Sequence, residues 1–353
     1  MKYARLVYGK NNEQFSKTQQ VNLGDYFQTF AIENIYDQIG ISKLQVETIN
    51  RRTLYDYKGE KMILPMQGWF GYIRGIEIFP MPDNIMPIFM GYHCVTKKRY
   101  NKLCLEQYRQ SEPVCCRDEK TYLLMKKNGI QAYLSGCFTI TLPQREVEPK
   151  KQHVFMVDAP NGIEKFMPES LKKNMTYITQ EVPIDYSCSE ESEIIRLEKL
   201  SRSLLERYKN EATLIVTSRL HCAAPCLGMG IPVVLARKYF DHRYEWIDKF
   251  LPLYTPEEFE NINWDVQKVD LSYIKPLLID LARAMIFDSD NKEILMEKVH
   301  EYYMDRERAK ISVPFYTRAY LRIQEINPRF ADFMREVVLK KFSVATARDK
   351  SEI

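Results

Sequence analysis

The sequence predicts two α/β domains with mostly parallel sheets. At 353 residues, 45% of them hydrophobic, the chain is too long for one ordinary core. Short apolar strand patterns alternate with helical periodicity in both halves of the chain, which is typical of parallel sheets covered by helices. Between the halves, Leu142–Gln152 is polar and contains two prolines, so this stretch is expected to be the linker.

Composition argues against several classes of protein. The net charge of +4, from 51 basic and 47 acidic residues, is far below the strongly basic charge typical of nucleic-acid-binding domains. Eight cysteines in a chain of this length do not make a disulfide scaffold. No CxxC pair is present, so the cysteines are interpreted as small buried thiols and no metal site is expected.

The N-terminal apolar run is too short for a signal peptide, and no later apolar segment has membrane length. A cytoplasmic protein without a transmembrane segment is therefore expected. Peripheral association with a membrane stays open.

The first half begins with a strand at Arg5–Tyr8, followed by a polar loop and a helix over the segment 22–36. Asp25 is expected to cap that helix, and Gly24 would let the backbone approach another group closely. An ordinary capped helix explains this turn as well as a functional site does. Further strands and helices are expected, in chain order, at Val46–Ile49, Met62–Met66, Ile85–Met90, Tyr100–Tyr108 (helix), Val114–Cys116, the helix closed by Asn128-Gly129, and Gln131–Leu134.

The second half opens with a strand at Val154–Val157 and later contains the most regular unit of the chain. Thr213–Thr217 and Ile231–Leu235 are apolar β-branched runs typical of strands buried on both faces. Small apolar residues between them, Cys222–Leu227, favour a short helix. The remaining elements are a strand at Met175–Thr179, a charged helix at Ser189–Lys209, and helices at Asp270–Phe287, Asn291–Lys310 and Tyr316–Phe342.

The turn before this short helix carries residues suited to anion chemistry. Ser218 can cap the helix, Arg219 can hold an oxyanion with two parallel hydrogen bonds, and His221 can move a proton. Parallel sheets bind ligands at the carboxyl ends of their strands, where helix N-termini offer unpaired N–H groups. Those N–H groups are expected to disfavour a charged imidazole until an anion is bound.

Two other turns place polar residues where a strand gives way to a helix, Asn22–Asp25 and Arg117-Asp118. Three such turns in one alternating chain predict a shared site. His93, at the end of a strand, is as readily a satisfied structural histidine as a site residue. Arg243, beyond the last clear strand, is added as a candidate for substrate binding.

Several motifs resemble the polysaccharide pyruvyl transferase family. The most specific is Thr-Ser-Arg-Leu-His (217–221) with its continuation Gly-Met-Gly-Ile-Pro-Val-Val. The others, spread in order over roughly residues 1–265, are Asn-Leu-Gly-Asp-Tyr-Phe-Gln (22–28), Pro-Ile-Phe-Met-Gly-Tyr-His (87–93), Cys-Arg-Asp-Glu-Lys-Thr (116–121) with the later Asn-Gly-Ile and Ser-Gly-Cys, and Leu-Tyr-Thr-Pro-Glu-Glu-Phe (253–259). Many relatives carry Gly where this chain has Cys222, a small residue that tightens the turn without excluding a ligand.

The resemblance implies a GT-B-like fold, with two Rossmann-type domains facing a cleft. It implies an N-terminal domain at 1–145 on the acceptor side, a phosphoenolpyruvate-side domain at 152–315, and C-terminal helices at 316–353 that pack back on the first domain. The implied reaction transfers pyruvate from phosphoenolpyruvate to a sugar of a surface polysaccharide, or of its lipid-linked precursor, as a cyclic ketal.

The resemblance also implies roles for individual residues. Arg219 and Arg117 would hold the donor, with His221 near the reacting carbons. Such a reaction needs two cationic groups, a proton donor and a base, and no metal or cofactor. His221 is assigned as general acid and Asp25 as a candidate base, and the substrate-binding set is Arg219, Arg117, Ser218, Asn22, Gly24, His93 and Arg243.

Two other functions stay open. A GT-B glycosyltransferase would share the architecture and would need an acidic residue that reads a nucleotide, for which Glu257 and Glu258 are weak candidates. A non-catalytic paralogue in polysaccharide assembly would share the fold without turnover.

Overall fold

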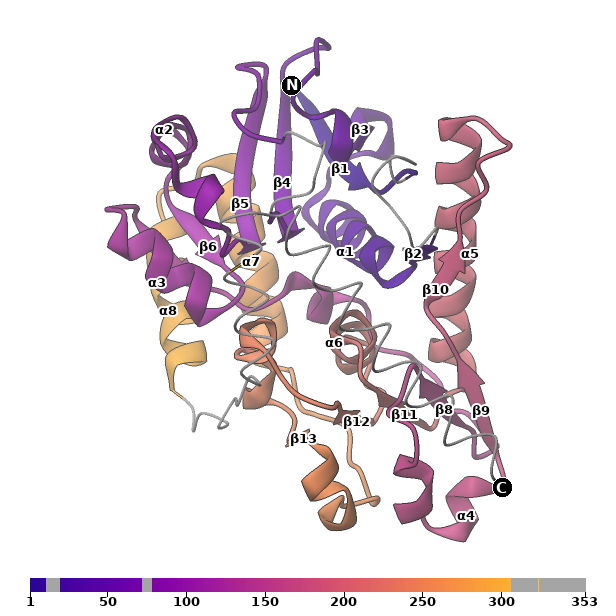
Figure 1. Ribbon diagram of the computed structural model, residues 1–353. Coiled ribbons are helices and arrows are strands. Elements are labelled where there is room, and N and C mark those ends of the chain that lie inside the picture. The colour runs from indigo at the N-terminus through magenta and orange to yellow at the C-terminus, as the bar shows by residue number, and fades with distance from the viewer. Residues whose placement is uncertain (11–19, 72–77, 306–322, 324–353) are drawn as a thin grey trace.

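The computed structural model describes residues 1–10, 20–71, 78–305 and 323. Two parallel sheets, one from each half of the chain, lie at opposite ends of the molecule with helices between and around them (Figure 1). The prediction of two α/β halves with parallel sheets and a GT-B-like arrangement is therefore confirmed. The predicted helix at 316–342 and most of the polar loop before Asn22 lie outside the described residues.

The N-terminal sheet has six parallel strands in the order β3-β1-β4-β5-β6-β7. Its central strand β4 is buried along nearly its whole length, as expected for a sheet covered on both faces, whereas the edge strand β3 buries only Ile49. Their bounds are β1 (Lys2–Val7), β3 (Val46–Asn50), β4 (Met62–Trp69), β5 (Ile85–His93), β6 (Val114–Cys116) and β7 (Ala132–Leu134).

The C-terminal sheet has five parallel strands in the order β13-β12-β11-β8-β9. Its central strands β8, β11 and β12 are buried along their whole length. The bounds are β8 (Val154–Val157), β9 (Met175–Ile178), β11 (Leu214–Thr217), β12 (Val233–Ala236) and β13 (Leu253–Tyr254).

The helices are α1 (Gly24–Ile39), α2 (Lys102–Gln110), α3 (Glu119–Lys127), α4 (Glu169–Lys172), α5 (Glu190–Glu211), α6 (Leu220–Gly228), α7 (Ile274–Phe287) and α8 (Lys292–Met304). Local signals set several of their ends. Ser189 accepts a hydrogen bond from the Ser192 N–H and caps α5, and Gly40, with φ of 83°, closes α1 in the left-handed conformation. Among the described helices, none combines the length and apolar character needed to span a lipid bilayer.

One hydrophobic core joins the two halves. Helices α1 and α6 pack against each other in the centre of the molecule, and α1 also contacts α5 (Figure 1). Phe27 on α1 meets Tyr208 on α5 edge to face, with ring centroids 6.3 Å apart. Because one helix from each half contributes to this core, the N-termini of α1 and α6 are held at a fixed separation.

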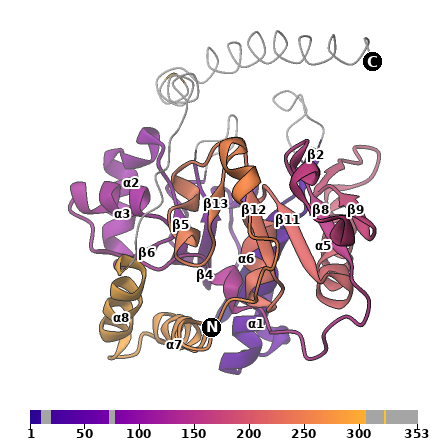
Figure 2. The same ribbon diagram turned by 90° about the horizontal axis from the view of Figure 1, so that it is seen from below.

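Helices α7 and α8 pack on the N-terminal sheet. Helix α7 lies beside α1 and contacts β5, and α8 contacts β7 (Figure 2). The Leu134 N–H on edge strand β7 donates to His300 Nδ1 on α8 at 2.9 Å, so the helix covers an edge that would otherwise be open. This differs from the expectation that residues 152–315 form one unit, because the chain returns to the first half before Ile274.

A short antiparallel pair also bridges the two halves. Strand β2 (Gln20–Asn22) precedes α1, and β10 (Glu181–Pro183) follows β9. They pair with Asn22 opposite Glu181, and the Leu23 N–H donates to the Gln180 carbonyl at 2.8 Å. This bridge ties the start of α1 to the C-terminal half.

Candidate functional site

Residues from all three predicted turns meet where the two halves face each other. Arg117, at the end of β6, donates from one terminal nitrogen to His221 Nε2 at 3.2 Å. The other ring nitrogen, His221 Nδ1, lies 3.4 Å from Asp25 Oδ1 in the first turn of α1. Two residues of the N-terminal half therefore contact one imidazole of the C-terminal half, and Arg117 is almost fully buried at 1% exposure.

The backbone at the start of α6 is shaped for this contact. His221 has φ of −85° and ψ of 22°, outside helical values, although it lies within the first turn. Gly24 allows the close approach, because a Cβ added there would lie 3.1 Å from the Cβ of His221. The close backbone approach expected at Gly24 is thus toward His221 and the neighbouring Gln180 side chain.

The charge environment of His221 differs from the sequence expectation. Burial lowers the pKa of His221, as does Arg117, but Asp25 and the Cys137 thiol outweigh them and hold the pKa above its ordinary value. The helix N-terminus was expected to disfavour the imidazolium in the free protein. That expectation is wrong because it did not include a carboxylate from the other half of the chain.

Cys137 is a neighbour of His221 that sequence reasoning did not select. It is fully buried, and its sulfur lies 3.1 Å from the Thr139 hydroxyl. Burial raises the pKa of the Cys137 thiol, but His221, Arg117 and Thr139 outweigh burial and lower it to about 7. The only sequence signal was the Ser-Gly-Cys segment, which ends at this residue.

His93 does not face the Asp25–His221 pair directly but belongs to an adjacent buried pair. Its Nδ1 hydrogen-bonds Asp118, which also caps α3 by accepting from the Thr121 N–H at 3.0 Å. Burial lowers the pKa of His93 to about 4 despite Asp118. Burial raises the pKa of Asp118, but His93 and Arg117 outweigh it, so the carboxyl titrates below its ordinary range. The imidazole is thus biased toward its neutral form and the carboxyl toward its ionised form.

The ring of His93 stacks on that of His242, with centroids 5.3 Å apart and planes at 20°. His242 comes from the segment after β12, so this stack is a further contact between the halves. His93 Nε2 is buried and has no hydrogen-bond partner among the described residues. Its position next to Arg117 keeps it a candidate for the site.

Arg219 is held by two carboxylates of its own half. Its Nε donates to Asp158 Oδ2 at 3.1 Å, and one terminal nitrogen donates to Glu181 Oε1 at 2.7 Å. Burial lowers the pKa of Arg219, but Glu181 and Asp158 outweigh it and raise the pKa above the ordinary value. In this structure the guanidinium edge expected to hold a donor is occupied by protein carboxylates.

Ser218 does not cap α6. Its hydroxyl donates to the Asp158 carbonyl at 2.6 Å, and Arg219 is the N-cap residue without a side-chain cap bond. Asp158 has φ of 45°, a left-handed conformation that costs free energy outside glycine. Asp158 follows β8, and the chain turns there so that its side chain reaches Arg219. The Ser218 hydroxyl therefore stabilises a strained residue.

Asp25 is likewise not the cap that the sequence predicted. Leu23 occupies the N-cap position of α1 and makes no side-chain cap bond. Asn22 instead accepts from the Gly24 N–H at 3.1 Å through its side chain. The Asp25 carboxylate is thereby left for His221, since helix capping does not use it.

Arg243 and Glu258 are engaged in local structure. Arg243 makes two hydrogen bonds to Asp241, at 2.8 Å and 2.7 Å. Glu258 closes a capping box with Thr255, whose N–H donates to it at 2.8 Å. Because this carboxylate caps a helical turn, it is poorly placed to read a nucleotide.

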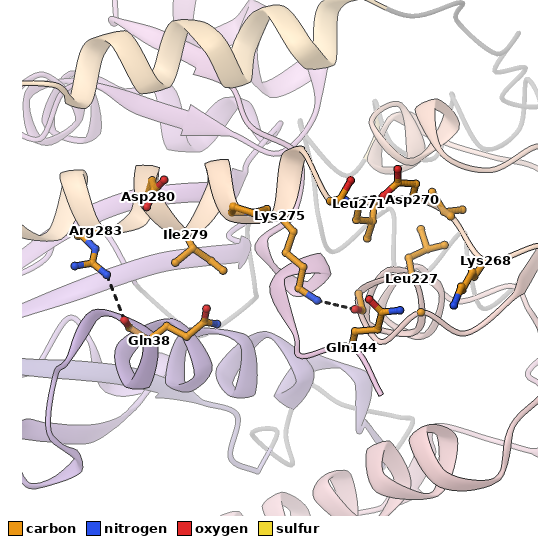
Figure 3. Close-up of a pocket in the computed structure, with 15 residues that line it drawn as sticks. Gln38, Gln144, Leu227, Lys268, Asp270, Leu271, Lys275, Ile279, Asp280 and Arg283 are labelled. Atoms are coloured by element: carbon orange, nitrogen blue, oxygen red, sulfur yellow. Dashed lines mark hydrogen bonds between the residues drawn. The ribbon is translucent and has the colours of Figure 1, made fainter. Parts of the chain in front are cut away.

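A cavity of about 660 Å³ lies at the far end of α6 from His221 and is lined in part by α7 and Gln38 of α1 (Figure 3). The Lys275 amine donates there to the carbonyls of Gly228 and Leu142, and Arg283 donates to the Gln38 carbonyl at 3.3 Å. The two Lys275 bonds connect α7 to the end of α6 and to the start of the predicted linker, and the Arg283 bond connects α7 to α1. The cavity therefore lies where α7 connects the two halves, away from Asp25 and Arg117.

The arrangement at His221 can hold anions and transfer a proton. Arg117 supplies a buried cation, the N-terminus of α6 supplies N–H groups, and the Asp25–His221 pair is a proton carrier supported by a carboxylate. Sequence reasoning named these three residues. It did not name Asp158, Glu181 or Cys137.

The family model for polysaccharide pyruvyl transferase matches residues 22–236, from Asn22 to the end of β12. No curated protein matches the chain.

Solved structures show only distant likeness. An uncharacterized protein from Klebsiella pneumoniae is 16% identical, with 68% of this chain and 87% of that chain covered and a TM-score of 0.37. WaaG, a glycosyltransferase involved in lipopolysaccharide biosynthesis, is 11% identical, with 86% and 96% covered and a TM-score of 0.31. Likeness at this level does not identify a function. The family match spans more than half of the chain and includes Asp25, Arg117 and His221, so the chain belongs to the polysaccharide pyruvyl transferase family and is a transferase.

Proposed function

We propose that this protein transfers the pyruvyl group of phosphoenolpyruvate to two hydroxyls of a sugar, forming a cyclic ketal. The observation that carries the proposal is the contact of His221 with both Arg117 and Asp25 across the two halves. Phosphoenolpyruvate has a carboxylate and a phosphate, and its enol carbon becomes electrophilic only when the methylene is protonated. A buried guanidinium beside a carboxylate-supported imidazole meets both requirements.

Donor binding is expected to load His221 with a proton. In the free protein the Arg117 N–H can donate to His221 Nε2 only while that nitrogen is unprotonated. An anionic donor that takes over Arg117 removes this bond and adds negative charge beside the ring. Asp25 remains on Nδ1 and stabilises the imidazolium, so the pKa of His221 rises further when the donor is bound.

The reaction then proceeds by addition and elimination. His221 Nε2 delivers a proton to the methylene carbon, one sugar hydroxyl adds to the enol carbon, and that hydroxyl's proton passes to a base. The C–O bond to phosphate breaks, and the second hydroxyl closes the ketal as its proton leaves with phosphate. In this proposal the protons are accepted by Asp25, which lies beside His221, or by the His93–Asp118 pair.

Arg219, Ser218, Asn22 and Arg243 keep supporting roles in this proposal. Arg219 would reach the donor only by giving up one of its carboxylates. Phosphoenolpyruvate is the co-substrate, and no further cofactor or metal is included. A lipid-linked sugar as acceptor, peripheral membrane association and a cytoplasmic location belong to the same proposal.

The test is direct. The protein is titrated with phosphoenolpyruvate and with common nucleotide sugars while its melting temperature is followed. Phosphoenolpyruvate alone should stabilise the fold, since only a ligand bound to the native state does so. Incubation with phosphoenolpyruvate and lipid-linked saccharides should release phosphate and add the mass of one pyruvate ketal. Stabilisation by a nucleotide sugar only would replace the proposal with a glycosyltransferase, and donor binding without turnover would favour a non-catalytic paralogue.

A further inference from the structure

Arg219 pairs with two carboxylates, one more than its single positive charge can balance. One guanidinium stands between Asp158 at 3.1 Å and Glu181 at 2.7 Å, so one positive charge faces two negative charges. The group of three carries a net negative charge, which repels a carboxylate or a phosphate. An anionic donor therefore gains little from Arg219 unless one of the two carboxylates moves away.

The two carboxylates are held very differently. Asp158 Oδ2 also accepts from the Gln180 N–H at 3.0 Å, the Asp158 carbonyl accepts from Ser218, and its side chain is 17% exposed. The Glu181 side chain is 41% exposed. Among the described residues, the Glu181 carboxylate pairs with Arg219. Glu181 is thus the carboxylate that can leave.

Movement of Glu181 does not require the fold to open. Its backbone is fixed in β10 by pairing with Asn22 of β2. A change of side-chain rotamer is enough to take the carboxylate into solvent, and such changes are fast for an exposed side chain. Arg219, at 28% exposure, would then present the freed nitrogen to an anion.

We propose that Glu181 gates Arg219, holding the guanidinium in the free protein and yielding it to the phosphate or carboxylate of the donor. The inference rests on the proposed function for the identity of the donor. It adds that the donor and the Glu181 carboxylate compete for Arg219. Product phosphate makes fewer contacts than the donor, so Glu181 displaces it. The gate therefore favours a ligand that contacts Arg117 and Arg219 together.

The experiment measures binding to the full chain by calorimetry, with phosphoenolpyruvate and, separately, inorganic phosphate. Glu181→Gln keeps the shape of the side chain and removes its charge. Both ligands should bind this variant about three- to tenfold more tightly than the unaltered protein. The matched control is Glu169→Gln, which neutralises an equally short surface ion pair, to Lys172 at 2.7 Å, in the same half of the chain. This control should leave both affinities unchanged.

The same substitution in a protein without Arg219 distinguishes a gate from a general change in the electrostatic potential of the site. In Arg219→Gln, the further change Glu181→Gln should have little effect, because the residue being gated is absent. An equal gain in that background would mean that Glu181 acts only through the overall charge, which overturns the inference. Equal or weaker binding by Glu181→Gln alone also overturns it.

These outcomes separate the gate from the proposed donor. If phosphate binds Glu181→Gln more tightly but phosphoenolpyruvate binds none of the proteins, the gate stands and the donor is wrong. If phosphoenolpyruvate binds and Glu181→Gln changes neither affinity, the donor stands and the gate is wrong.

Discussion

The two arginines of the site, Arg117 and Arg219, differ in burial and in their charged neighbours. Arg117 is almost fully buried, makes no ion pair with a described carboxylate and contacts the His221 imidazole. Arg219 is 28% exposed and forms ion pairs with Asp158 and Glu181. A buried cation without a counter-ion is costly, whereas a paired one at the surface is not. The difference indicates that Arg117 is ready for an anion and that Arg219 must first be released.

The largest effect is expected at the imidazole that Arg117 contacts. His221→Gln keeps a hydrogen-bond donor but removes the proton carrier, so turnover should fall by about 10²–10⁴ at saturating phosphoenolpyruvate. Steady-state kinetics over a range of donor concentrations measures this. A near-normal rate once donor is saturating would make His221 a ligand, and His93 would be the next candidate for the acid.

Lysine replacements compare the two arginines directly. Arg117→Lys should weaken phosphoenolpyruvate binding about 10- to 100-fold, because an ammonium lacks the planar fork of a guanidinium that is paired with no described carboxylate. Arg219→Lys should cost less, about three- to tenfold, since part of that fork is already occupied by Asp158 and Glu181.

Calorimetric titration of both variants, with melting temperatures as the check on folding, decides the ranking. Equal losses would show that the burial of Arg117 has no bearing on donor binding. An Arg219→Lys protein with unaltered donor affinity would remove Arg219 from the donor site.

The pH dependence of the rate tests the carboxylate on the other side of His221. A general acid is active below its pKa, so the rate should fall on the alkaline side as pH rises through the raised pKa of His221. Asp25→Asn removes a contact that raises this pKa, and the alkaline limb should therefore move to lower pH. Because Asp25 does not cap α1, the melting temperature should change little. An unmoved limb would separate Asp25 from His221 in function.

The smallest effect is expected beside Arg219. Ser218→Ala removes the hydroxyl that donates to the Asp158 carbonyl at 2.6 Å, a loss of about 0.5–1.5 kcal/mol in the free energy of unfolding. Donor affinity should change by less than it does in Arg219→Lys. Denaturant unfolding measures the first quantity and calorimetry the second. A large loss of affinity with unchanged stability would instead place the Ser218 hydroxyl on the donor.

Elements with strong local signals were predictable from the sequence. The run Thr213–Thr217 is a buried strand because β-branched apolar residues fit a sheet covered on both faces, and α6 follows it as the small residues indicated. The three polar turns were expected to share a site because the carboxyl ends of parallel strands lie at one edge of a sheet. Two of them contribute side chains that contact His221.

Contacts between distant parts of the chain were decided by the tertiary structure. Asp25 lies near His221 only because α1 and α6 share a core, and the sequence favoured a helix cap with equal reason. Glu181 belongs to a three-residue strand without a periodic signal, yet its pairing with β2 brings it to Arg219. The return of α7 and α8 to the N-terminal sheet was likewise hidden, since periodicity shows that a helix is amphipathic but not which surface it covers. Local propensity acts over a few residues, whereas these contacts join residues far apart in the chain and depend on how the two halves pack.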